Sequence, residues 1–141
     1  MSEGIGARVL RKEDKRFITG KGRYTDDIIE PNQAYAAFVR SPHAHARIVS
    51  LDTSAALAME GVETVLTGPE LVADGIGNII CGWGITSKDG TPMNMGAWSA
   101  LATEKVRYVG DAVAIVVADS KSQAKLAAEA VVVTYEELPV V

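Results

Sequence analysis

The run Val113-Ala-Ile-Val-Val-Ala118, with Ser120 and the segment 121–130 directly after it, decides the fold class. A short, continuous apolar run rich in β-branched residues predicts a strand that is buried on both faces. Ser120 is followed three positions later by Gln123, the pattern of a capping box, which predicts a helix over residues 121–130. A further strand is predicted over residues 131–135.

The first half of the chain contains a shorter version of the same pattern. Strands are predicted over residues 47–51 and 62–66, with a helix over residues 54–59 between them, capped by Asp52 or Thr53. Each half could be a strand–helix–strand unit, which would be right-handed if its strands are parallel. A strand over residues 34–39 and a short helix over residues 70–73 complete the elements. The fold class expected is therefore α+β, a mixed sheet with a few helices.

Composition limits the classes of protein. The chain has 141 residues, enough for one domain, with 48% hydrophobic and 23% charged residues. Its net charge of -4 argues against nucleic-acid binding. The N-terminus has no apolar leader, and no stretch approaches the ~20 apolar residues of a membrane span. These features predict a soluble cytoplasmic protein, and the apolar end at Val140-Val141 suggests a cut between domains.

Two segments are expected to be irregular. Residues 1–33 contain a basic cluster that is expected to form either a solvated arm or an arm that docks on another surface. Residues 74–104 are interrupted by glycines, yet they hold too many apolar side chains for a solvated linker. They should fold back on the domain or become buried against another one. The basic residues are Arg8, Arg11, Lys12, Lys15 and Arg16, and the apolar residues of the second segment are Ile79, Ile80, Trp83, Met93, Met95 and Trp98.

The stretch Arg40-Ser-Pro-His-Ala-His-Ala-Arg-Ile48 is unusually polar beside a predicted core strand. In an extended segment, His43 and His45 would point to one face and could begin a metal site. No spacing connects them to further ligands, although Asp26, Asp27 and Cys81 are available. We therefore expect Arg40, His43, His45 and Arg47 to be structural or interface residues, and we predict no metal ligands.

Other reactive residues also favour structural interpretations. Cys81, the single cysteine, has no local base to activate it, so a small buried hydrophobe is expected. Gly20 and Gly22 do not precede a helix, which favours a tight turn over a phosphate cradle. Asp26-Asp27 and Glu136-Glu137 are expected to cap or to be solvated, since neighbours on a strand face opposite sides. No catalytic or cofactor-binding residue is predicted, which suggests a module of something larger.

Five motifs in order carry a family resemblance over nearly the whole chain. The chain resembles the N-terminal α/β-hammerhead domain of the molybdenum-cofactor (large) subunit of the xanthine dehydrogenase, aldehyde oxidase and aerobic carbon monoxide dehydrogenase family. Arg11-Lys-Glu-Asp14 and Arg16-Phe-Ile-Thr-Gly20 are most similar to the carbon monoxide dehydrogenase-like branch, whereas Ser99-Ala-Leu-Ala102 departs from the commonest pattern. The motifs are Gly20–Ile28, Arg40–Ile48, Gly61-Val62 with Val65–Gly68, Val106–Gly110 with Val113-Ala114, and Val133–Pro139.

The resemblance implies a part of an oxidoreductase that hydroxylates its substrate with water as the oxygen source. Electrons would pass from molybdopterin-bound molybdenum through iron–sulfur clusters to FAD or another acceptor. It implies as partners the remaining domains of the large subunit and the iron–sulfur and flavin subunits or domains. The molybdopterin contacts and the glutamate base of the family lie in later domains, so the resemblance assigns no cofactor ligand to this chain.

These observations lead to one expected function and two alternatives. The chain is expected to be one hammerhead domain, residues 1–141 with an irregular arm at 1–33, which supports assembly and is inactive by itself. Trp83 and Trp98 join the polar cluster as candidate interface residues. Alternatively, the chain is a freestanding interaction module that binds a protein partner through residues 74–104. A small independent enzyme that uses Cys81 is the third alternative. The sequence does not identify a substrate.

Overall fold

The computed structural model describes residues 4–6 and 10–140, in two compact units, residues 1–33 and residues 34–141. The first unit contains a short helix, α1 (Asp14–Ile18), and a 3₁₀ turn, η1 (Thr25–Asp27). Tyr24 stacks on Phe17 with their ring centroids 5.6 Å apart. Backbone N–H of Tyr24 donates to Asp27 Oδ2 at 2.9 Å, which confirms the expected capping role of that carboxylate.

The basic residues of this unit are partly engaged within it. The guanidinium groups of Arg11 and Arg16 lie 5.5 and 5.1 Å from the centroid of the Phe17 ring, and both also bond Glu13. Such exposed cation–π contacts contribute on the order of 0.5–1 kcal/mol. Arg8, which the sequence places in the same cluster, lies outside the described residues.

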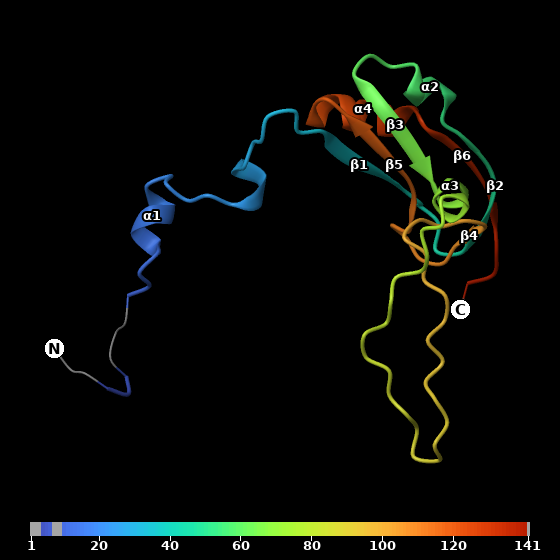
Figure 1. Ribbon diagram of the computed structural model, residues 1–141, viewed down its shortest axis with the longest axis horizontal. Helices are drawn as coiled ribbons and strands as arrows, with labels where there is room; N and C mark the ends of the chain where they lie inside the picture. The colour runs from blue at the N-terminus through green and yellow to red at the C-terminus, as the bar shows by residue number, and fades with distance from the viewer. Residues whose placement is uncertain (1–3, 7–9, 141) are drawn as a thin grey trace. The chain divides into compact units, whose positions relative to one another are not determined.

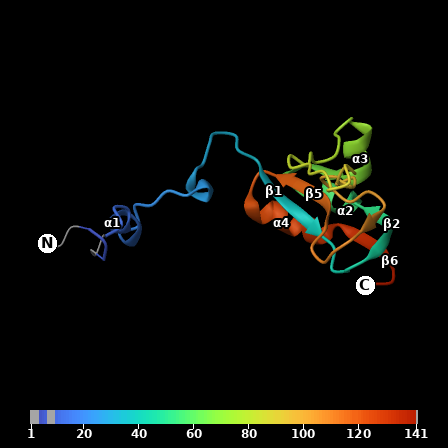
Figure 2. The same ribbon diagram turned by 90° about the horizontal axis from the view of Figure 1, so that it is seen from below.

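The second unit consists of two three-stranded sheets with strand orders β1-β5-β3 and β4-β2-β6 (Figures 1 and 2). Every strand pairing among the described residues is antiparallel. Helix α4 packs on β5 and β1. The elements are β1 (Tyr35–Arg40), β2 (Ala46–Asp52), α2 (Ser54–Leu57), β3 (Val62–Thr67), α3 (Gly68–Ala73), β4 (Lys105–Val106), β5 (Ala112–Ala118), α4 (Lys121–Ala130) and β6 (Val132–Glu137).

The two strand–helix–strand units exist, but they are not parallel crossovers. The β2–α2–β3 unit runs from one sheet to the other, and the β5–α4–β6 unit runs back. Strand β3 then pairs with β5, and β2 pairs with β6, both antiparallel. The rule that crossovers between parallel strands are right-handed therefore does not apply to these two units. The prediction of a mixed α+β fold with a few helices is confirmed.

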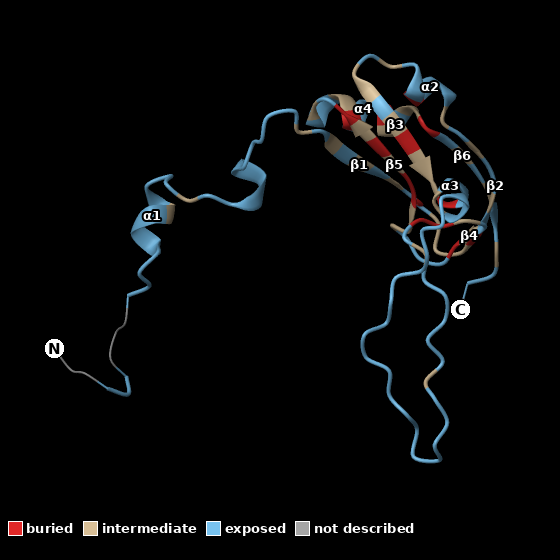
Figure 3. Ribbon diagram, viewed as in Figure 1, coloured by how far each residue is buried: buried red, intermediate tan, exposed pale blue. Residues whose placement is uncertain are grey.

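The core lies under α4 and between the sheets (Figure 3). Val116 and Val113 are fully buried on β5. They belong to different apolar clusters, and Val113 is the extra residue of β5 opposite the Val39–Arg40 step, where the register shifts. Ile115 and Val117 are only half-buried. The sequence predicted that this strand is buried on both faces. That prediction is wrong for the face that carries Ile115 and Val117, because this face is partly exposed to solvent.

The helix starts depend on side-chain caps. Backbone N–H of Gln123 donates to Ser120 Oγ at 3.3 Å, so the predicted cap of α4 is confirmed. Backbone N–H of Ser54 donates to Asp52 Oδ1 at 2.9 Å at the start of α2, which ends at Leu57, earlier than expected. Helix α3 starts at Gly68, earlier than predicted, because Glu70 accepts a hydrogen bond from Thr67 N–H at 2.8 Å.

Between α3 and β4 the chain leaves the body of the unit as a long two-armed excursion (Figure 1). Residues 76–98, here named the apolar ribbon, form its arms. The arms are joined by few backbone hydrogen bonds: Ile79 N–H to Trp98 O at 2.8 Å, Met93 N–H to Ile85 O at 3.0 Å, and Ser87 N–H to Thr91 O at 2.8 Å at the tip. Almost every residue of the ribbon is exposed (Figure 3).

Candidate interaction site

The predicted polar cluster at residues 40–47 forms contacts within the unit itself. Arg40 Nη1 donates to Gly110 O at 2.9 Å, and its guanidinium lies 5.2 Å from the centroid of the Phe38 ring. Next to it, Ser41 is 2% exposed, its N–H donates to Asp111 O at 2.9 Å, and its carbonyl accepts from Gly110 N–H at 2.8 Å. These bonds join the end of β1 to the turn that precedes β5.

The two histidines join the same loop to the C-terminal strand. His43 Nδ1 lies 3.4 Å from Glu137 Oε1, and its ring packs at 4.8 Å on Tyr135. His45 Nδ1 lies 2.8 Å from Pro139 O, so the tautomer with a proton on Nδ1 donates to that carbonyl. Their partners differ, and the two imidazoles do not converge on one metal position.

Arg47 lies opposite Glu136 on β2 and β6, with 3.3 Å between Nε and Oε2. Both side chains are largely exposed, so the pair contributes at most about 1 kcal/mol. Glu137, the neighbour of Glu136, faces His43 instead, as expected for adjacent residues of a strand. The cluster at 40–47 therefore connects the end of β1 and the start of β2 to the turn before β5 and to the C-terminal strand. Its role in an interface stays a prediction.

Trp83 and Trp98, the other predicted interface residues, lie on the apolar ribbon. The structure does not bring them together with the polar cluster. Trp98 lies against Tyr108, with 6.2 Å between ring centroids, whereas Trp83 is 80% exposed. Ile80 is 89% exposed. A contiguous display of large apolar side chains on a protein surface is typical of an interaction site.

Cys81 corrects one expectation. It was predicted to be a small buried residue, but it is exposed on the ribbon. The reason is that the ribbon does not fold back on the body, so nothing in the described part of the chain covers its arms. Of the two alternatives for residues 74–104, folding back is therefore wrong for the ribbon arms, whereas Leu101 and Ala102 are buried in the body.

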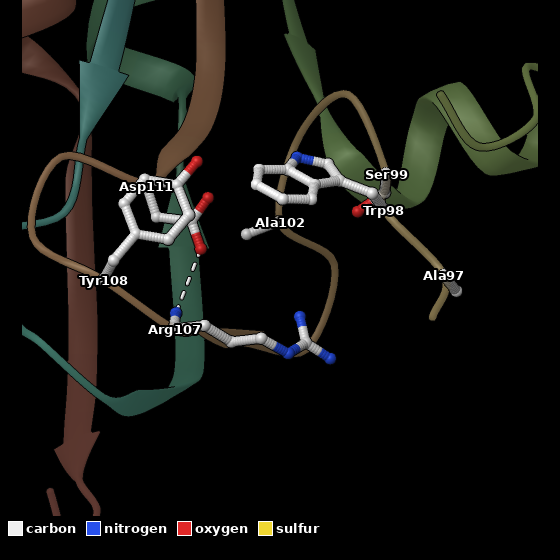
Figure 4. Close-up of a pocket in the computed structure, with 7 residues that line it drawn as sticks. All are labelled: Ala97, Trp98, Ser99, Ala102, Arg107, Tyr108 and Asp111. Carbon is white, nitrogen blue, oxygen red and sulfur yellow. Dashed lines mark hydrogen bonds between the residues drawn. The ribbon is translucent and has the colours of Figure 1, made fainter. Parts of the chain in front are cut away.

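Two hollows lie where the ribbon joins the body. The first, of about 170 Å³, is lined by residues of the ribbon end and of the β4–β5 connection (Figure 4). The second, of about 580 Å³, runs along both arms of the ribbon. They share Ala97, Trp98 and Arg107.

The first hollow contains residues that sequence analysis did not single out. Arg107 N–H donates to Asp111 Oδ2 at 3.0 Å, as the dashed line in Figure 4 marks. Partial loss of hydration, and next the nearby Asp111 carboxylate, raise the pKa of Tyr108. The motif Val106–Gly110 was visible in the sequence, but its side chains gave no signal, because Trp98, which lies against Tyr108, comes from the end of the ribbon.

The site offers no set of metal ligands. No group of three or more His, Cys, Asp or Glu side chains in the described ranges could hold a metal ion. The residues that line the hollows are mainly aromatic and aliphatic, with one guanidinium and one carboxylate, those of Arg107 and Asp111. They fit an apolar side chain or peptide rather than a metal or molybdopterin, so no redox step is assigned to them. No helix among residues 4–6 and 10–140 is long and apolar enough to cross a membrane.

The fold and the site define a small α+β domain with an exposed apolar arm. Residues 19–139 match the family model described as the aldehyde oxidase and xanthine dehydrogenase a/b hammerhead domain, and the chain belongs to that family. The predicted family membership and hammerhead fold are thereby confirmed.

Two curated relatives illustrate the match. The carbon monoxide dehydrogenase large chain of Hydrogenophaga pseudoflava is 44% identical over 139 residues, which are 98% of this chain and 16% of the relative. The nicotine 6-hydroxylase large subunit of Paenarthrobacter nicotinovorans is 43% identical over 97% of this chain and 16% of the relative. The chain therefore spans about one-sixth of the length of these relatives.

Solved structures agree with the sequence matches. The crystal structure of quinoline 2-oxidoreductase from Pseudomonas putida 86 matches with a TM-score of 0.81 and 40% identity, over 96% of this chain and 16% of that one. The Cu,Mo-CO dehydrogenase matches with a TM-score of 0.74 and 42% identity, over 97% and 16% of the two chains. The chain is thus similar to the hammerhead domain of molybdenum hydroxylase large subunits.

Proposed function

We propose that the chain serves as an assembly module of a molybdenum hydroxylase large subunit in the cytoplasm and does not catalyse the reaction by itself. The apolar ribbon would pack against the remaining domains of that subunit. The observation that carries this proposal is the exposure of Ile80 and Trp83, at 89% and 80%, on a segment held by few bonds to its own chain. Such side chains lose water contact when a partner covers them, which favours association.

The parent reaction that we propose is water-dependent oxidative hydroxylation, with iron–sulfur and flavin subunits or domains as partners in electron transfer. The similarity to a carbon monoxide dehydrogenase, a nicotine 6-hydroxylase and a quinoline 2-oxidoreductase supports the reaction class. These relatives carry different substrate names, so the family match alone selects no substrate. Molybdenum would supply the redox chemistry from a part of the subunit that lies beyond these residues.

A chimera tests the assembly role. This chain replaces the 139 matched residues of the Hydrogenophaga pseudoflava large chain, and chymotrypsin cleavage after Trp83 and Trp98 is followed over time. Cleavage should be at least about tenfold slower in the chimera than in the separate chain, because docking removes the ribbon from the protease. Equal cleavage rates would contradict the proposal, and the unmodified large chain shows how much protection a native junction gives.

A freestanding interaction module remains the second candidate, and the same exposed ribbon favours it. It predicts that the ribbon stays open to chymotrypsin in the chimera. Protection would then appear only when a separate protein partner is added.

A further inference from the structure

The two hollows at the base of the apolar ribbon form one continuous feature, here named the Arg107 groove. Its volumes are about 170 and 580 Å³, and Trp98 and Arg107 line both parts. The larger part, along the ribbon arms, has space for an extended stretch of side chains. The smaller part ends against the β4–β5 connection.

The groove walls are mostly apolar. Ile79, Ile80 and Met95 line the larger part, and the tilted pair of Trp98 and Tyr108 lies at the smaller part. All of these apolar side chains are at least half exposed in the chain by itself, apart from Tyr108 at 45%. An occupant with an aromatic or aliphatic side chain would therefore remove water from both surfaces.

The groove contains one guanidinium and one carboxylate, and the two are not paired through their side chains. The Asp111 carboxylate already accepts a hydrogen bond from the Arg107 backbone N–H, and it also contacts Tyr108. The Arg107 side chain extends away from that carboxylate (Figure 4). Within the described ranges, no ion pair engages the Arg107 guanidinium. Among the residues that the structure describes, the groove thus presents one guanidinium that no ion pair neutralises.

We propose that the Arg107 groove binds a segment of the rest of the large subunit in which an aromatic or aliphatic side chain lies close to an aspartate or glutamate. The apolar side chain packs against Ile80, Met95 and Trp98, which line the larger part, and the carboxylate pairs with Arg107. This inference rests on the proposed assembly role and names the part of the surface, and the chemistry, that carries it out.

Two observations select this occupant. The relatives extend over about six times the matched length, since the chain covers 16% of them, so family members carry most of their surface in segments outside this domain. A guanidinium at the rim of an apolar groove also favours a carboxylate, which it binds with two parallel hydrogen bonds. A second copy of the chain is a poorer occupant, because twofold pairing of the grooves would bring two Arg107 side chains near each other.

The test uses the full-length chimera described above. Arg107→Glu should speed chymotrypsin cleavage after Trp98 about fivefold or more, because the carboxylate of the occupant is then repelled. Arg107→Lys should keep most of the protection, and Arg107→Gln should lie between the two. Lys125→Glu is the matched control, since Lys125 is an exposed cation on α4, outside both hollows. Its cleavage rate should equal that of the parent chimera.

A charge exchange then identifies the occupant. Asp→Lys or Glu→Lys changes in the rest of the large subunit are screened in the Arg107→Glu chimera, and one of them should restore protection. The thermal midpoints of the Arg107 variants are measured to show that they remain folded. Arg107→Gln keeps the inference falsifiable if the glutamate variant fails to fold.

The outcomes separate the two proposals. If the parent chimera is protected and both the Arg107→Glu and Arg107→Gln variants are protected equally well, the groove inference is wrong and the assembly role stands. If Lys125→Glu loses as much protection as Arg107→Glu, the effect is one of net charge, and the inference is also wrong. If the parent chimera is not protected, the assembly role itself fails.

Discussion

The body of the second unit and its apolar ribbon are both rich in large apolar residues, but they use them in opposite ways. In the body, Val113 and Val116 are fully buried between helix and sheets. In the ribbon, Ile80 and Trp83 are almost fully exposed. The difference lies in the pairing partners: β5 has a strand on each side and is packed by α4, whereas the two ribbon arms are joined to each other by a few backbone hydrogen bonds.

This contrast assigns different physical roles to the two regions. Buried apolar area and ladder hydrogen bonds give the body its free energy of unfolding. The exposed ribbon contributes little to that free energy and is available for contact with another surface. Changes in the body should therefore alter stability, and changes in the ribbon should alter docking. The following expectations test that division, beginning with the largest effect.

Gly68→Ala should be the most destabilising change. A Cβ at this position would lie 2.3 Å from Ala102 O. This is a backbone atom, and it cannot move without displacing the segment that leads into β4. We expect a loss of about 3 kcal/mol in the free energy of unfolding, as for overpacking in a close-packed core. Urea unfolding followed by circular dichroism measures it.

The matched control is Gly77→Ala in the ribbon. Nothing lies within 4 Å of a Cβ at Gly77, so stability should stay within about 0.5 kcal/mol of the parent. Equal losses for the two variants would remove the distinction between the body and the ribbon.

Val116→Ala should cost about 2 kcal/mol, because it leaves a cavity at the centre of β5. Trp83→Ala deletes a far larger side chain, yet it should change stability by less than about 0.5 kcal/mol. Thermal unfolding of both variants makes the comparison direct. A larger loss for Trp83→Ala would mean that the ribbon packs on the body.

Ser120→Ala should cost about 1 kcal/mol, since it removes the acceptor for the first turn of α4. Ser122→Ala is the control, because Ser122 lies two residues further along, inside the same helix, and is exposed; it should have a much smaller effect. Hydrogen exchange at the start of α4 checks the local origin of the loss. Unchanged exchange there would contradict it.

The smallest effect concerns alkaline pH. Burial raises the pKa of Tyr135 above its ordinary value of 10.0. Because the neutral phenol is favoured in the folded state, its contribution to stability is fully present below pH 10 and is lost as the pH rises through the folded pKa. Tyr135→Phe should lose less stability on going to high pH than the parent does. Identical losses in urea unfolding across this range would contradict the assignment.

The structure confirms most predictions that depend on residues close together in the sequence. The Ser120 cap, the helix at 121–130 and strands within one or two residues of the expected ranges all depend on neighbours a few positions apart. The Thr67–Glu70 capping box was equally local, and the pattern Thr-Gly-Pro-Glu could have given the earlier start of α3.

The errors share a different cause. The exposure of Cys81, the half-exposed face of Ile115 and Val117, and the antiparallel pairing of both units depend on which distant segments meet. Arg107, Tyr108 and Asp111 were missed for the same reason, since the groove exists only when the ribbon end lies beside the β4–β5 connection.

The sequence by itself determined the local elements, their caps, the likeness to the hammerhead family and the polar character of residues 40–47. The tertiary structure alone decided that the two strand–helix–strand units cross between sheets, that Trp83 is exposed, and that Arg107 faces an apolar groove. The physical reason is range. Helix caps and hydrophobic periodicity depend on contacts within a few residues. Burial depends on segments that are far away in the chain. For the ribbon, the covering segments lie in another part of the assembly that we propose.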